Sequence, residues 1–240
     1  MFQEKREDFP TLCGENPPVY LDNACMTLRP KPVIDAIRSY YEESPGCAGR
    51  SVHRYATTVS RKVVNCRSKM SKMFNANSPD EIIFTKNATH SLNQVAKGLS
   101  WNKGDVVLTT DREHNSNLVP WLQLEQEQGI DHRVVRSNTD NTFDIEAFEE
   151  ACANAGDKLR MVSLSHVGNL DGVATPVKQA AKIAKDHGAM VCIDGAQSTP
   201  HMKVDVQDLG VDFMAFSIHK MMGPSGMGGL WGKMELLENM

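Results

Sequence analysis

The residues best suited to chemistry gather near the end of the sequence. Ser217, His219 and Lys220 follow an apolar stretch and precede a glycine-rich segment. A lysine amine beside cations and away from water loses its proton more easily, and it can then attack a carbonyl to form an imine. Glycines allow the backbone to approach a ligand closely. Because most lysines are solvated surface charges, Lys220 alone does not define a site.

Asp194 is a second candidate, at the end of the apolar stretch 190–194 and three residues before Gln197. A carboxylate at the end of a buried strand is costly unless a cationic group meets it. A protonated ring nitrogen is such a group, and Gln197 could reach the same ligand. An aspartate that only caps the next helix explains the pattern equally well.

Three more polar segments follow apolar stretches, and each has two interpretations. His114 could stack on a flat ring, ligate a metal or transfer a proton, or it could be an ordinary loop residue. Asn169 could donate its amide to a ring oxygen or form a turn. Thr89, with the backbone of Ala88, opens a predicted helix and could bind an anion, although a plain helix cap is favoured from this segment alone.

Short apolar strands and amphipathic helices alternate along the chain. We expect strands at residues 81–85, 105–109, 132–135, 160–164, 190–194 and 213–217. We expect helices at residues 90–98, 119–128, 144–154 and 177–187. This alternation is typical of a mainly parallel sheet covered on both faces, so the sequence predicts a three-layer α/β/α domain. Ligands of such sheets bind beyond the carboxyl ends of the strands, where the candidate residues lie.

The composition excludes several functional classes. The 240 residues are 40% hydrophobic and 23% charged, as in ordinary globular proteins. With 26 basic and 30 acidic residues, the net charge of −4 provides no basic field for nucleic acid. The apolar stretches are too short to cross a membrane, and the first residues lack the apolar core of a secretory signal. Six scattered cysteines without zinc-ligand spacing favour a cytoplasmic protein with no structural metal.

Taken together, these segments resemble the class V aminotransferase family of pyridoxal 5'-phosphate (PLP) enzymes, and within it the Suf-type cysteine desulfurases and selenocysteine lyases. The resemblance covers nearly the whole chain and rests on ordered motifs at residues 20–24 (YLDNA), 49–53 (GRSVH), 113–121 (EHNSNLVPW), 166–169 (HVGN), 194–197 (DGAQ) and 217–220 (SIHK), the last followed by its glycine turn. It implies the large domain of a type I PLP-dependent transferase, with residues 1–25 as an N-terminal segment and residues 26–240 as the PLP-binding domain.

The resemblance also implies a role for each candidate residue. Lys220 would hold PLP as a Schiff base and move protons on the substrate carbon, Asp194 would keep the pyridine nitrogen protonated, and His114 would stack on the ring. The other implied cofactor contacts are the ring-oxygen residues Asn169 and Gln197 and the phosphate residues Ala88, Thr89, Ser217 and His219. Weaker assignments on the substrate side are Arg50 and Ala24. No metal is implied.

The activity implied by the resemblance is the conversion of L-cysteine to L-alanine, with persulfide sulfur passed to an acceptor protein for iron–sulfur cluster assembly. A homodimer is also implied. Family members are longer, and the resemblance places the nucleophilic cysteine and the arginine that binds the substrate carboxylate in a C-terminal small domain absent from this chain.

None of the six cysteines is predicted to replace that nucleophile. Cys192 falls in a predicted buried strand, and Cys66 and Cys152 fall in helical patterns, where cysteine usually acts as a small apolar residue. Nothing in the sequence marks Cys25 or Cys47 as a reactive thiol. Two alternatives stay open: another class V activity, such as a selenocysteine lyase, amino-acid lyase, epimerase or aminotransferase, and a non-catalytic remnant that binds PLP. For this chain alone, the remnant ranks above full activity.

Overall fold

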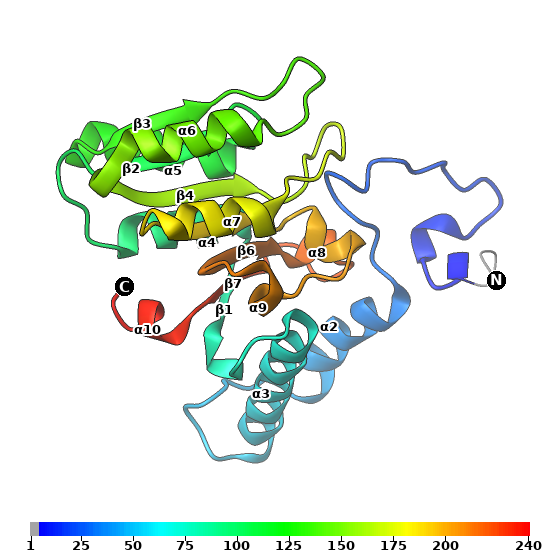
Figure 1. The fold of residues 1–240 in the computed structure, drawn as a ribbon. Coiled ribbons are helices and arrows are strands. Elements are labelled where there is room, and N and C mark those ends of the chain that lie inside the picture. Colours follow the sequence, from blue (N-terminus) through cyan, green and yellow to red (C-terminus); the bar gives the residue numbers. More distant parts are fainter. Residues whose placement is uncertain (1–4) are drawn as a thin grey trace.

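The computed structural model describes residues 5–240, which form a seven-stranded mixed sheet in the order β1-β7-β6-β5-β4-β2-β3 (Figure 1). From β6 to β3 the neighbouring strands are parallel, whereas β7 is antiparallel to both β1 and β6. The strands are β1 (Ile82–Thr85), β2 (Val106–Thr110), β3 (Asp131–Val135), β4 (Leu159–Ser165), β5 (Met190–Asp194), β6 (Phe213–Ser217) and β7 (Gly228–Gly232).

All six predicted strands are confirmed to within about a residue or two, but β7 was not predicted. The expected glycine turn is shorter than the sequence suggested, because Gly228 and Gly229 belong to this strand. A Cβ at Gly228 would overlap the backbone of Asn87, and one at Gly229 would overlap the ring of Phe216. Glycine is therefore used here for close packing inside a strand, as well as for turning at Gly226, where φ is +75°.

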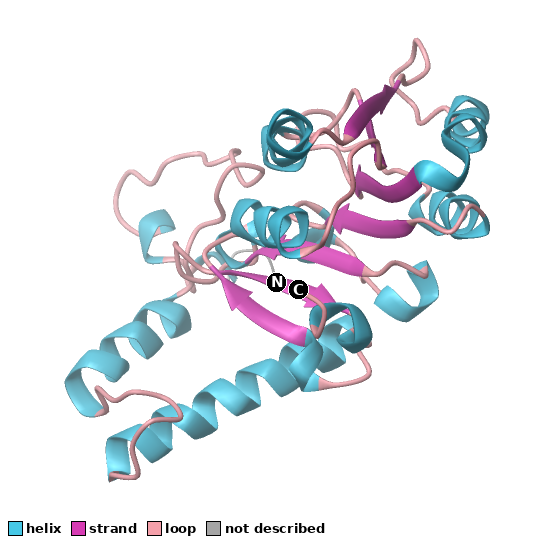
Figure 2. Ribbon diagram, turned by 90° about the vertical axis from the view of Figure 1, so that its left-hand side faces the viewer, coloured by secondary structure: helices cyan, strands magenta, loops and turns pink. Residues whose placement is uncertain are grey.

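Helices cover both faces of the sheet, so the predicted three-layer arrangement is confirmed (Figure 2). The strand residues alternate between two apolar clusters: Val107 packs with α4 and α5, whereas Val106 and Leu108 pack with α6 and α7. The four covering helices are α4 (Ala88–Gly98), α5 (Asn115–Gln128), α6 (Ile145–Ala155) and α7 (Val177–Asp186).

Two helices before the sheet, α2 (Lys31–Glu43) and α3 (Arg54–Phe74), are not among the expected ranges, although the helical pattern around Cys66 falls in α3; both lie apart from the sandwich in Figure 1. No residue of α2 is buried, and α3 is anchored at its end by Phe74, whose ring centroid lies 5.0 Å from that of Phe216. Single helical turns complete the fold: α8 (Ser198–His201), α9 (Val206–Leu209) and α10 (Met234–Leu237).

The cysteines are placed only partly as expected. Cys152 and Cys192 are buried, as predicted, but Cys66 is exposed on α3 because this long helix packs through only a few residues. Among residues 5–240, no helix is both long and apolar enough to cross a lipid bilayer.

Candidate active site

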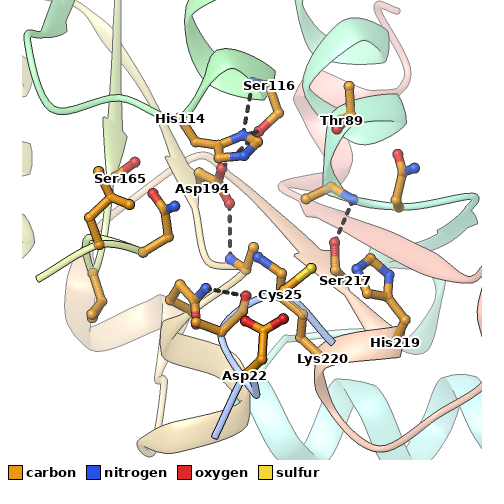
Figure 3. A pocket seen from close by; sticks show the side chains of 18 residues that line it. Asp22, Cys25, Thr89, His114, Ser116, Ser165, Asp194, Ser217, His219 and Lys220 are labelled. Carbon is orange, nitrogen blue, oxygen red and sulfur yellow. Dashed lines mark hydrogen bonds between the residues drawn. The ribbon is translucent and has the colours of Figure 1, made fainter. Parts of the chain in front are cut away.

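A cavity of about 490 Å³ opens at the carboxyl edge of the parallel strands. Figure 3 shows side chains from several strand ends and from the N-terminal segment around it. The structure brings together these predicted site residues: Ala24, Ala88, Thr89, His114, Asn169, Asp194, Gln197, Ser217, His219 and Lys220. Arg50 is the exception, because it lies exposed in the turn before α3 and does not line the cavity.

Asp194 ends β5 with only 5% of its surface exposed. Its Oδ1 accepts a hydrogen bond from the Ala196 amide at 2.9 Å, and its Oδ2 lies 3.3 Å from Ser116 Oγ. Burial raises the pKa of Asp194, while the Ala196 amide and the charges of Lys220 and His114 oppose that rise. A protonated ring nitrogen is the kind of partner that would favour the charged carboxylate.

Lys220 ends the short helical turn Ile218–Lys220, which directly follows β6. Because β5 and β6 are paired neighbours, the Lys220 amine and the Asp194 carboxylate reach the same cavity (Figure 3). The ion pairs found within residues 5–240 include neither side chain. The chain thus presents an amine and a buried carboxylate to one ligand.

His114 is positioned as the N-cap of α5, where its Nδ1 accepts a hydrogen bond from the Ser116 amide at 3.1 Å. The same Nδ1 lies 2.7 Å from Ser116 Oγ. The residue itself is exposed to the cavity, so its ring face can cover a flat ligand. Ser116 lies in the motif at residues 113–121 but was not predicted as a site residue, although a serine two residues after a helix-capping residue often bonds to it.

The start of α4 forms the opposite end of the cavity. Asn87 caps this helix by accepting the His90 amide at 2.8 Å, and the Ala88 amide donates to Ser217 Oγ at 3.0 Å. The missing side chain of Gly228 lets Asn87 lie directly against β7. A helix N-terminus with a neighbouring hydroxyl is well suited to an anion such as phosphate.

Basic groups add to this preference for an anion. Burial lowers the pKa of His219, and the positive charges of Lys220 and Arg29 lower it further. Arg29 was not singled out in the sequence; it lies outside the cavity lining, and its Nη2 is 3.3 Å from Ser225 Oγ. His219 and Lys220 both line the cavity, whereas Arg29 acts on His219 through its charge from outside the lining.

Residues 20–27 close the site from the N-terminal side. Gln197 Nε2 donates to the carbonyl of Ala24 at 2.7 Å, and Thr27 Oγ1 donates to the carbonyl of His219 at 2.9 Å. The amide of Met222 donates to Thr27 Oγ1 at 2.9 Å, and Met222 itself has a φ of +62°. These bonds join residues about 170 to 195 positions apart, so sequence spacing gave no sign of them.

Cys25 also lines the cavity, as Lys220 does (Figure 3). The other described cysteines lie outside the lining: Cys13, Cys47, Cys66, Cys152 and Cys192. Whether any of the six replaces the family nucleophile stays a matter of prediction, and we predict that none does.

Residues 19–240 match the family model for aminotransferase class-V. The chain belongs to the class V aminotransferase family. It is 40% identical to a probable cysteine desulfurase of Halalkalibacterium halodurans, over 99% of this chain and 59% of that protein. The apo structure of a cysteine desulfurase from Thermococcus onnurineus NA1 matches 99% of this chain and 58% of its own, with a TM-score of 0.90 and 35% identity.

This class V chain therefore spans a little under three fifths of the length of these relatives. A C-DES mutant with glycine covalently linked to its PLP cofactor has the same fold, with a TM-score of 0.84 and 26% identity over 98% of this chain and 61% of that chain. The expectation of a three-layer α/β/α fold with a mainly parallel sheet is confirmed, and the antiparallel pairing of β7 with β1 and β6 makes the sheet mixed.

Proposed function

We propose that this chain is the PLP-binding part of a cysteine desulfurase. The observation that carries the proposal is the convergence of Lys220, Asp194 and His114 on one cavity whose far end favours an anion. PLP requires an amine, an acid for its ring nitrogen, a flat group over its ring and dipoles for its phosphate. The likeness to cysteine desulfurases over nearly the whole chain supports the same reading.

The residues would divide the work as follows. When bound, PLP supplies an electron sink for the substrate carbon. Lys220 Nζ would carry the cofactor and then take and return a proton at that carbon. Asp194 would hold a proton on the ring nitrogen, and His114 would shield one face of the ring from water. The ring-oxygen and phosphate contacts would come from Ala88, Thr89, Asn169, Gln197, Ser217 and His219.

The proposed reaction removes sulfur from L-cysteine and leaves L-alanine. The sulfur would pass as a persulfide to an acceptor protein that supplies iron–sulfur cluster assembly. We also propose a cytoplasmic homodimer. These finer assignments rest on the family resemblance, and the cavity supports the cofactor part of the proposal most directly.

The test begins with purified chain and added PLP. We expect the visible absorption band of lysine-bound PLP, its loss in Lys220→Ala, and its retention in Lys97→Ala, a control lysine near the end of α4. A band that persists in Lys220→Ala would show that the amine is assigned wrongly.

Product analysis then tests the reaction. The protein with bound PLP is given L-cysteine and a thiol reductant, and alanine and sulfide are measured. Alanine formed together with sulfide supports a desulfurase, whereas ammonia and pyruvate with sulfide would indicate a lyase. PLP binding without any turnover would favour the non-catalytic alternative for this chain alone.

A further inference from the structure

The hydroxyl of Ser116 lies between the two groups proposed to hold the cofactor ring. Its Oγ is 2.7 Å from His114 Nδ1 and 3.3 Å from Asp194 Oδ2 (Figure 3). Ser116 is 8% exposed, so water competes little for this hydroxyl. The second residue of α5 thus touches both the imidazole and the carboxylate.

Counting protons limits what this hydroxyl can do. A serine hydroxyl has one proton to donate, and a neutral imidazole has one nitrogen that donates and one that accepts. The Ser116 amide donates to His114 Nδ1 at 3.1 Å, so Nδ1 is the accepting nitrogen in the neutral ring. Ser116 Oγ can then only donate to Nδ1, and it has no proton left for Asp194.

Protonation of His114 reverses the arrangement. A charged imidazole donates from both nitrogens and accepts at neither. Nδ1 must then donate to Ser116 Oγ, which frees the hydroxyl proton for Asp194 Oδ2. The Ser116 amide then loses its acceptor, because Nδ1 carries a proton, and the 3.3 Å separation of Oγ and Oδ2 must shorten toward about 2.8 Å for a strong bond.

We propose that Ser116 is a positioning residue that couples the protonation state of His114 to the hydrogen bonding of Asp194. With His114 neutral, the hydroxyl holds the proton of the imidazole on Nε2 and leaves Asp194 Oδ2 open for a cationic donor. With His114 charged, the hydroxyl occupies Oδ2 itself. Only the effect of this coupling on bound PLP rests on the proposed function. The hydrogen bonds among His114, Ser116 and Asp194 are formed by this chain itself.

Other titratable groups surround the pair and must be separated from it. From the neighbouring elements these are Glu113, His166, Cys192 and Lys220. Glu113 is held by Thr110, Asn117 and Ser165, and Lys220 acts on Asp194 through its charge. Their effects act across space and do not require a hydroxyl at position 116.

The experiment is nuclear magnetic resonance on the full chain without PLP, so it does not depend on whether the proposed function is correct. The ring nitrogens of His114 and the side-chain carboxyl carbon of Asp194 are followed between about pH 5 and pH 9, the range in which histidines ordinarily change charge. In the wild type we expect neutral His114 to carry its proton on Nε2, and the Asp194 signal to move in the same pH step as the imidazole.

Ser116→Ala should remove the part of that step carried by the hydroxyl and leave only the part due to the charge of His114, and Ser116→Thr, which keeps a hydroxyl, should restore the full step. Ser71→Ala, a buried serine of α3 remote from the cavity, should leave it unchanged. An undiminished step in Ser116→Ala would overturn the proposal. If Ser116→Ala fails to fold, the wild type alone still decides, because a neutral His114 with its proton on Nδ1 contradicts the proposed arrangement.

Discussion

Two buried aspartates at opposite ends of the parallel strands have very different surroundings. Asp212, 2% exposed and one residue before β6, pairs with Lys185 and Lys233 and accepts the Val191 amide at 2.8 Å. Among residues 5–240, the carboxylate of Asp194, 5% exposed at the end of β5, has only an amide and a hydroxyl within hydrogen-bonding distance. At the amino ends of the strands the buried carboxylate is already paired with two lysines, whereas at the carboxyl ends the buried carboxylate is available to a ligand. The aspartate at the amino ends thus contributes to stability, and the aspartate at the carboxyl ends is suited to binding a ligand.

The largest loss of stability should come from removing the paired aspartate at the amino ends of the strands. Asp212→Ala leaves two lysines and a buried amide without their acceptor, so we expect a loss of about 3 kcal/mol in the free energy of unfolding, measured by urea denaturation. The control is Asp208→Ala, which breaks the exposed pair with Lys178 and should cost less than about 1 kcal/mol. Equal losses in both variants would break the comparison.

A second substitution tests the close packing of β7 against the start of α4 beside the cavity. Gly228→Ala forces a Cβ against the backbone of Asn87, and we expect it to cost about 2 kcal/mol and to weaken PLP binding at the phosphate end. Gly98→Ala at the other end of α4 meets only the flexible side chain of Met240, so it should be tolerated. Normal PLP titration of Gly228→Ala would show that this close approach does not shape the site.

Removing the charge of Asp194 should change stability in the opposite direction from removing that of Asp212. Because burial raises the pKa of Asp194, the folded chain binds a proton there more tightly than the unfolded chain, and this residue's contribution to stability falls as pH rises through the raised pKa. Asp194→Asn should therefore stabilise the PLP-free chain by on the order of 1 kcal/mol at neutral pH, while weakening PLP retention. The gain should shrink toward pH 4. A destabilised Asp194→Asn at pH 7 would contradict this account.

The smallest loss of stability should come from removing one of the two lysines that pair with Asp212. Lys233→Ala removes one of two lysines around Asp212, and its side chain is 31% exposed. We expect a loss of about 0.5 kcal/mol that decreases as salt is added, because Lys185 remains. Denaturation at low and high salt measures it, and a loss as large as that of Asp212→Ala would indicate that Lys233 alone satisfies the carboxylate.

The sequence predicted the strands and most of the cavity because both depend on local pattern. Each buried strand is a short apolar run, and Asp194 and Lys220 are read directly from where two runs end. The polar residues converge because parallel strands share one carboxyl edge.

The parts that were missed depend on contacts between distant residues. β7 consists of Gly, Gly, Leu, Trp and Gly, and it forms a strand because its glycines fit against Asn87 and Phe216. α2 has no buried residue, yet Val33, Ile37 and Tyr40 recur with helical spacing, so this helix could have been recognised from the sequence. Arg50 belongs to a quoted motif, yet it lies in a turn whose course is set by α3, so its motif membership did not place it in the cavity.

The position of β7 also affects the order in which the protein can be assembled. β1 and the start of α4 leave the ribosome early, but among the described strands β1 is hydrogen-bonded only to β7, which follows it by about 140 residues. Pairing across such a separation is slow. Until residues 228–232 have been synthesised, β1 therefore lacks its partner among the described strands, and the sheet beside the start of α4 stays incomplete.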